Sequence, residues 1–290
     1  MNKNQVLIVG FGKLANKIAV RLQQQNRELT ALVRHAEMAE TLRADNIKPL
    51  LADLADADSL SSIDVSGSEV YFFAPPSRQD DSDHHMSNFL SAIKQQPAKK
   101  ILYISTTAVY GNSHGDWVSE SSVTEPTTAR GRRRLDAEQQ LIAFSEQYDV
   151  PIVILRVSGI YGSDRLPLRQ LESGRPVLID EDSGYTNRIH VEDLANVCLI
   201  AMERGAGIYN VSDGNPGTMA EYFISLAEVL GYPIPERISL AEAREIMSPE
   251  MMSYLVESRR LDSTRLREEL GVELMYPGLA AGIRQIVESR

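Results

Sequence analysis

Short apolar runs alternate with amphipathic stretches through the first 160 residues. A strand that is apolar at every position is buried on both faces, which is typical of a parallel sheet covered by helices on both sides. The sequence therefore predicts an α/β fold with a doubly wound parallel sheet. We expect strands at Val6–Val9, Leu29–Val33, Pro49–Ala52, Val70–Ala74, Ile101–Ser105 and Ile152–Val157, and helices at Lys13–Gln25, Ala36–Ala44, Met86–Lys94 and Arg132–Gln147.

The rhythm changes after Gly159, and residues 161–185 show no strong period. Beyond them we expect a helix at Val191–Glu203, a strand at Ile208–Val211 and a helix at Thr218–Leu230. We predict a domain over residues 1–160 and, over 161–290, a mixed region that completes the sheet and forms a small C-terminal substrate lobe. Ligands of such folds bind at the carboxyl edge of the sheet.

Charge and cysteine content restrict the partners. The net charge is -10 and the pI is about 5.1, so nucleic acid and anionic membranes are not expected partners. The single cysteine, Cys198, allows no intrachain disulfide and no multi-cysteine metal site, and we expect it to be buried. The pair His84-His85 has no third ligand at a useful spacing, so no metal is predicted and a surface position is expected. Without a signal peptide or membrane span in the sequence, the predicted location is the cytoplasm.

A glycine turn follows the first expected strand. Residues 10–15 read Gly-Phe-Gly-Lys-Leu-Ala, which is G-x-G-x-x-A between a strand and a helix. Gly10 allows the tight turn, Gly12 allows backbone to approach a pyrophosphate, and the helix offers free N–H groups to the phosphates. Lys13 and Leu14 begin that helix. This context favours dinucleotide binding over a plain strand-to-helix turn.

The end of the second expected strand distinguishes the two nicotinamide cofactors. An NAD site places Asp or Glu about 20 residues after the glycines, to hold the ribose 2′-hydroxyl. This chain has Arg34 and His35 there, with Glu37 the first acid. Because an arginine fork matches a 2′-phosphate, we predict NADP as the preferred cofactor and NAD as the alternative.

Further segments resemble the extended short-chain dehydrogenase/reductase superfamily, the nucleotide-sugar epimerase/dehydratase relatives. The resemblance is carried by Ser105-Thr106-Thr107-Ala108-Val109-Tyr110-Gly111, Leu155-Arg156-Val157-Ser158-Gly159-Ile160-Tyr161-Gly162 and Asn187-Arg188-Ile189-His190-Val191-Glu192-Asp193-Leu194-Ala195. It implies an NAD(P)-binding Rossmann fold. It also implies that Asp53 and Leu54 meet the adenine and that Ala74 contacts the cofactor. The G-x-G turn points to an atypical subgroup.

The resemblance also implies a catalytic Tyr and a Lys four residues later, and here the chain departs from the family. Aligned on Pro126 and residues 135–138, the Tyr position holds Arg130 and the Lys position holds Arg134. Thr106 occupies the Ser/Thr position that orients the reacting oxygen. Arginine stays protonated near neutral pH and cannot shuttle a proton. Arg134 could instead bond ribose hydroxyls, and Arg130 an anionic group.

Other basic and titratable residues are weaker candidates. A solvated surface patch is the expected role of Arg132 and Arg133. His114, Asp116 and Tyr185 are candidate substitute acid/base groups. For His190, a structural role is favoured over a catalytic one.

Two classes of function remain open. The first is an NAD(P)-dependent reductase-like or epimerase/dehydratase-like enzyme acting on a small, oxygen-rich substrate that is anionic or sugar-like, in which Thr106, Arg130 and Arg134 form the reaction site. The second is a catalytically silent dinucleotide-binding sensor, supported by the missing Tyr–Lys pair. A homodimer is an additional expectation taken from the relatives.

Overall fold

The computed structural model describes residues 5–288, apart from the side chains of residues 164, 250 and 253. The chain divides into two compact units. The sheet unit comprises residues up to Val109 together with Ala129–Arg156 and Ala195–Tyr209, and the lobe unit comprises the remainder. The sequence predicts one boundary at residue 160, but the chain passes between the two units several times. Tyr110–Thr128 belongs to the lobe unit, and Ala195–Tyr209 belongs to the sheet unit.

A seven-stranded sheet in the order β12-β7-β5-β4-β1-β2-β3 forms the centre of the sheet unit. The pairings β1–β2, β2–β3, β1–β4 and β4–β5 are parallel. The predicted α/β doubly wound fold is thus confirmed, and the chain reverses direction across the sheet between β1 and β4. The strands are β1 (Gln5–Val9), β2 (Glu28–Val33), β3 (Lys48–Leu51), β4 (Glu69–Phe72), β5 (Lys100–Thr106), β7 (Ile152–Val157) and β12 (Gly207–Val211).

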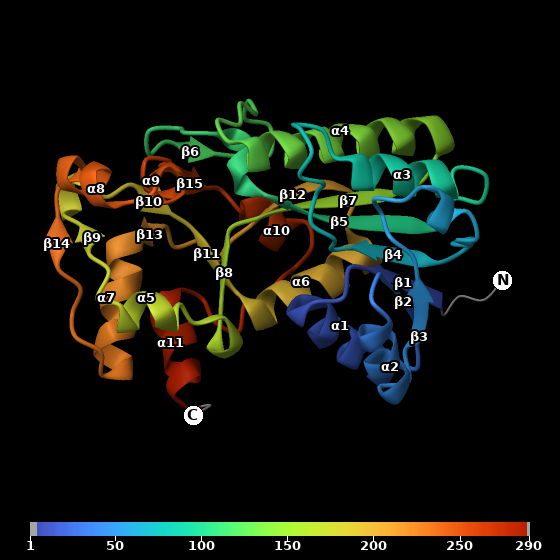
Figure 1. Cartoon of the computed structure of the whole chain (residues 1–290), viewed down its shortest axis with the longest axis horizontal. Coiled ribbons are helices and arrows are strands. Elements are labelled where there is room, and N and C mark those ends of the chain that lie inside the picture. Colours follow the sequence, from blue (N-terminus) through green and yellow to red (C-terminus); the bar gives the residue numbers. More distant parts are fainter. Residues whose placement is uncertain (1–4, 289–290) are drawn as a thin grey trace. The chain divides into compact units, whose positions relative to one another are not determined.

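Helices cover both faces of this sheet (Figure 1), with α3 and α4 on one side and α1, α2 and α6 on the other. Two helices begin earlier than the sequence predicts. The α3 helix starts at His84 because the Asp83 carboxylate accepts hydrogen bonds from the His85 and Met86 N–H groups, capping the first turn. The α4 helix starts at Ala129. The helices are α1 (Lys13–Gln24), α2 (Ala36–Ala44), α3 (His84–Ile93), α4 (Ala129–Tyr148) and α6 (Val191–Arg204).

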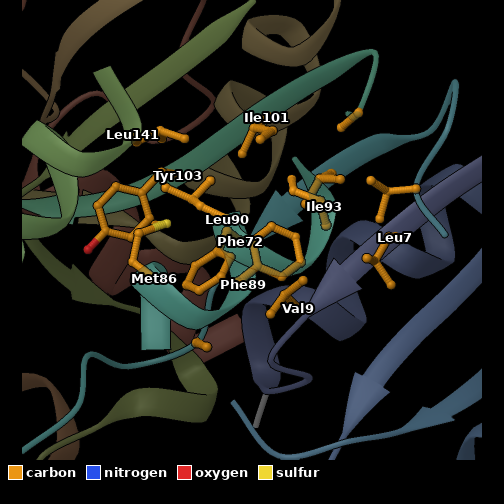
Figure 2. Close-up of a cluster of buried hydrophobic side chains, with 14 of the residues drawn as sticks. Leu7, Val9, Phe72, Met86, Phe89, Leu90, Ile93, Ile101, Tyr103 and Leu141 are labelled. Carbon is orange, nitrogen blue, oxygen red and sulfur yellow. The ribbon is translucent and has the colours of Figure 1, made fainter. Parts of the chain in front are cut away.

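One part of the core of the sheet unit lies between the sheet and the α3–α4 layer. Figure 2 shows Phe72, Phe89 and Tyr103 packed together there. The Phe72 ring centroid is 5.2 Å from that of Phe89 and 5.9 Å from that of Tyr103, in edge-on geometry. Cys198 is buried as expected, and burial raises the pKa of its thiol. This packing fixes the carboxyl ends of β1, β4 and β5, where the predicted site residues lie.

The lobe unit contains short strand pairs and short helices around two apolar clusters. One cluster contains Tyr161 and Leu226, and the other contains Leu178, Ile238 and Ala243. Among residues 5–288, no helix has the length and apolar character needed to cross a membrane. The strands are β6 (Trp117–Val118), β8 (Gly159–Tyr161), β9 (Val177–Leu178), β10 (Tyr185–Thr186), β11 (Arg188–His190), β13 (Gly217–Thr218), β14 (Arg237–Ile238) and β15 (Arg260–Leu261). The helices are α5 (Leu168–Glu172), α7 (Met219–Leu230), α8 (Leu240–Ile246), α9 (Pro249–Leu255), α10 (Thr264–Glu268) and α11 (Leu279–Glu288).

Candidate functional site

The turn between β1 and α1, which we call the glycine turn (residues 10–12), brings two strand ends into contact. Gly10 has a φ of +87°. A Cβ at Gly10 would stand 2.7 Å from the Ala74 backbone nitrogen, at the end of β4. Both the left-handed backbone and the close approach require glycine here. The predicted contact residues Gly10 and Ala74 therefore lie together at the ends of β1 and β4, where the strand order of the sheet reverses.

The N-terminus of α1 is open to an anion. Gly12 stands at the N-cap position and has no side chain that could accept a hydrogen bond from the first N–H groups of the helix. The first turn contains no acidic residue. A Cβ at Gly12 would meet nothing within 4 Å. Lys13 is exposed and the Leu14 side chain is buried, so Leu14 can offer a ligand only its backbone N–H. Uncapped N–H groups at the positive end of a helix dipole bind phosphate.

Beside the glycine turn lies a cavity of about 260 Å³, which we call the β1–β2 cavity. Five of the residues predicted to bind cofactor line it, namely Gly10, Arg34, Asp53, Leu54 and Ala74. Gly12, Lys13 and Leu14 are not part of the lining.

The cavity has a positively charged residue at the end of β2 and a negatively charged residue near the end of β3. At the end of β2, Arg34 Nε donates to His35 Nε2 over 2.9 Å. Near the end of β3, the Asp53 carboxylate accepts from the Ala55 N–H over 2.9 Å. Asp53 is the one acid among the described residues that line the cavity. No carboxylate of the lining therefore stands at the end of β2, where an NAD site would place one.

His85 also lines the β1–β2 cavity, a role that the sequence did not suggest. Its Nδ1 lies 3.0 Å from the Pro75 carbonyl oxygen. His84 and His85 are partly exposed at the start of α3, in keeping with the surface position predicted for them, and the Asp83 cap starts the helix there. The Asp83-x-x-Met86 spacing ahead of an apolar run was the available signal.

A second group of predicted residues, Thr106, Arg130 and Arg134, lies on β5 and α4, and we call it the β5–α4 corner. Arg134 Nη1 donates to Tyr103 Oη over 3.0 Å and to the Ile104 carbonyl over 2.8 Å. Thr106 ends β5, and its Oγ1 accepts from the Ala108 N–H over 3.3 Å. Burial raises the pKa of Tyr103 to about 12. Tyr103 is fully buried, so it cannot serve as the missing catalytic tyrosine.

A buried ion pair fixes this corner. Arg156 on β7 donates to the Glu138 carboxylate on α4, with an Nη2–Oε2 distance of 2.8 Å, and the Ser105 hydroxyl donates to the same carboxylate. Both charged side chains are at most 5% exposed. The pair joins α4 to β5 and β7, and the sequence analysis did not find it because its members come from separate elements.

The remaining arginines of α4 are attached to the segment before α3. Arg132 forms an exposed ion pair with Asp81 at 2.8 Å, in keeping with a surface residue. Arg133 Nη1 donates to the Asp80 carbonyl over 3.1 Å, and its Nε is buried without a partner among the described residues. The solvated-patch interpretation is therefore wrong for Arg133, because α3 and its preceding segment pack against α4.

The candidate substitute acid/base groups all lie in the lobe unit. His114 and Asp116 are exposed, and His114 has a φ of +51°. Tyr185 is 42% exposed, and the Arg260 guanidinium lies 4.9 Å from its ring centroid. His190 is buried, with its ring centroid 4.1 Å from that of Tyr276. The packing of His190 favours the structural role expected of it.

Comparison with known proteins agrees with this architecture. The model of the NAD dependent epimerase/dehydratase family matches residues 6–212. The chain belongs to this family. Within it the chain is atypical, because Arg130 and Arg134 stand at the Tyr and Lys positions.

Among curated proteins, the chain is 25% identical over 280 residues to a 4-hydroxy-2-methyl-3-oxo-4-farnesyl-3,4-dihydroquinoline-1-oxide ketoreductase from Stigmatella aurantiaca, covering 89% of this chain and 83% of that protein. Matches to a human dTDP-D-glucose 4,6-dehydratase and to a UDP-glucose 4-epimerase from Streptomyces lividans cover only 38% and 55% of those proteins. The chain thus spans less than two thirds of these sugar-nucleotide enzymes.

Among solved structures, a functionally unknown conserved protein from Silicibacter pomeroyi aligns with a TM-score of 0.83 at 30% identity, covering 99% of both chains. A UDP-glucose 4-epimerase from Thermus thermophilus, in complex with NAD, aligns with a TM-score of 0.79 at 21% identity over 98% of both chains. At that identity the second likeness describes the fold alone.

Proposed function

We propose that the chain binds NADP(H) in the β1–β2 cavity and uses it in a reductase-like or epimerase/dehydratase-like reaction on a small oxygen-rich substrate. The observation that carries the cofactor assignment is Arg34, which lines the cavity at the end of β2 where an NAD site would present an acid. The residues fit a dinucleotide: Gly10 admits no side chain, Gly12 faces open space, and the first turn of α1 is uncapped.

Residues of the β1–β2 cavity and of the first turn of α1 would hold different parts of the dinucleotide. The N–H groups of residues 12–14 would bind the pyrophosphate, and Arg34 would pair with the 2′-phosphate. Asp53 and Leu54 would meet the adenine, and Ala74 would border the pyrophosphate. Arg134, held by Tyr103, would direct its remaining N–H groups to ribose hydroxyls. A bound nicotinamide supplies a hydride donor or acceptor.

The β5–α4 corner would handle the substrate. The Thr106 hydroxyl would orient a carbonyl or hydroxyl oxygen, and Arg130 would bind an anionic group or an oxygen-rich ring. Because neither arginine can exchange a proton near neutral pH, the proton would come from water or from a substitute acid/base group. The ketoreductase relative and the UDP-glucose epimerase relatives support a carbonyl or hydroxyl as the reacting group.

Titration of the purified protein with NADPH and with NADH, followed by calorimetry, tests the cofactor assignment. We expect NADPH to bind about tenfold more tightly, since the Arg34 fork gains a charge-assisted partner only from the 2′-phosphate. A tenfold preference for NADH would reverse the assignment, and no uptake of either nucleotide would remove it.

A catalytically silent dinucleotide-binding protein is the second candidate. The observation that favours it is the fixed arginine: Arg134 Nη1 is already bonded to β5, and the tyrosine beside it is buried. Restoring the family pair with R130Y and R134K together should create or raise oxidation of NADPH on a panel of carbonyl compounds if the protein is an enzyme. R132Y, on the exposed side of α4, is the control. No gain over this control would favour the silent protein.

A further inference from the structure

The lobe unit contains an apolar cavity of about 210 Å³ to which the proposed function assigns no role. Its walls come from β9, α7, α9 and the segments beside them. An engineered apolar cavity of about 150 Å³ already takes up benzene, so this space is large enough for a hydrocarbon segment. The apolar side chains of its lining include Val177, Leu178, Met219, Phe223, Met251 and Leu255.

The cavity lies between the two apolar clusters of the lobe unit. Leu178, Met247 and Leu255 belong to one cluster, while Met219 and Phe223 pack against the other. The cavity opens to the surface, and its lining is mostly apolar with a few polar groups. A concave, mostly apolar pocket of this kind is the usual form of a small-molecule site.

Methionine is prominent in this lining. Met219, Met247 and Met251 contribute long, unbranched side chains from or beside α7, α8 and α9. Such side chains adjust to irregular apolar shapes and are common at binding surfaces. They suit a ligand with a flexible hydrocarbon body.

One positively charged residue, Arg175, lines the apolar cavity. A second cavity of about 370 Å³ shares Arg175, Met247 and Met251 with the first. Of the described residues that line either cavity, Arg175 is the only charged one. It is exposed, and its side chain makes no hydrogen bond or ion pair within residues 5–288 as described. In a chain of net charge -10, an unpaired arginine beside an apolar chamber is complementary to one anionic group.

We propose that the lobe unit binds a small amphipathic carboxylate, with its hydrocarbon body in the apolar cavity and its carboxylate on Arg175. This site goes beyond the proposed cofactor function and does not depend on it. The apolar walls favour a ligand with a hydrocarbon body, and Arg175 favours a carboxylate as its head group.

Calorimetric titration of the full chain with decanoate tests the apolar part. We expect binding in the wild type, weakened at least about tenfold by M251W, because an indole would occupy the space that the ligand needs. M275W places the same ring on a side chain that is 54% exposed and outside the lining, and it should bind decanoate as the wild type does. Absence of decanoate binding, or equal loss in both variants, would overturn the site.

The charged part is tested with R175Q, a surface change that leaves the core intact. R175Q should weaken the binding of decanoate about fivefold and leave the binding of 1-decanol unchanged, since only the carboxylate forms a charge-assisted hydrogen bond with the guanidinium. R169Q, an exposed change on the neighbouring α5, is the control. An unchanged affinity for decanoate in R175Q would overturn the head-group assignment. Parallel titrations with NADPH separate the two sites, because each can fail while the other binds.

Discussion

The glycine turn and the β5–α4 corner lie in the same sheet unit but relate differently to the family. At the glycine turn, the backbone conformation requires a particular residue type, and the chain has glycine there: Gly10 has a positive φ and lies against Ala74. At the corner, the supporting frame remains, with Thr106 at the end of β5 and α4 fixed by Glu138 and Arg156. The two positions that the family resemblance assigns to the catalytic Tyr and Lys hold Arg130 and Arg134 instead. The two regions therefore call for separate tests, one of cofactor binding and one of the frame around these arginines.

The largest effect should come from breaking the frame of the corner. E138Q would leave the Arg156 guanidinium buried without its countercharge, which costs about 3–5 kcal/mol for pairs of this kind. We expect the urea midpoint of unfolding to fall by a corresponding amount. The control is E203Q, whose carboxylate meets Arg204 at 3.8 Å in an exposed pair and should change stability by less than about 1 kcal/mol. Equal stability of the two variants would mean that the corner has no such frame.

A comparable loss, in binding rather than stability, should follow from filling the glycine turn. Gly12 has a φ of −117° and a ψ of −166°, which any residue adopts, so G12V should fold. Its side chain would project where backbone N–H groups meet the pyrophosphate. We expect NADPH affinity to fall about a hundredfold, close to 2.7 kcal/mol. A36V places the same side chain at the exposed start of α2 and should bind normally. Unchanged affinity in G12V would exclude the turn from the site.

These two regions also differ in how far the sequence predicts them. The glycine turn follows from a local pattern, since a strand, two glycines and a helix are contiguous in the chain. The Glu138–Arg156 pair and the attachment of Arg133 do not follow, because they join α4 to elements far along the chain. The place of His85 beside the cavity could not be predicted because it depends on the contact of His85 with Pro75, ten residues away in the chain. The α/β class was predictable because buried parallel strands are apolar throughout.

A smaller effect should distinguish the two cofactors at the end of β2, in the β1–β2 cavity. R34Q keeps length and polarity but loses the charged fork that would face a 2′-phosphate. We expect NADPH affinity to fall about tenfold, or 1.4 kcal/mol, with NADH affinity unchanged. R43Q, exposed in the last turn of α2, is the control. Equal weakening of both nucleotides by R34Q would mean that Arg34 acts on a group common to both.

The smallest effect concerns a buried carboxylate beside the corner. Burial raises the pKa of Asp83 above its ordinary value near 3.8, although Oδ1 accepts from backbone N–H groups and Arg134 lies nearby. Its Oδ2 is buried without a partner among the described residues. Because the folded pKa is raised, the stability that Asp83 contributes is complete below the unfolded pKa and is lost as pH rises through the folded pKa.

D83N removes this titration and keeps an oxygen to cap α3, since Asn and Asp cap helices about equally well. Relative to the wild type, the variant should gain melting temperature as pH rises from below 4 to neutrality. D64N provides the opposite sign, because hydrogen bonds from Ser66 lower the pKa of Asp64. Its loss relative to the wild type should therefore grow over the same pH range. A pH-independent difference for D83N would mean that the pKa of Asp83 is the same in the folded and the unfolded protein, so that burial of this carboxylate does not affect its titration.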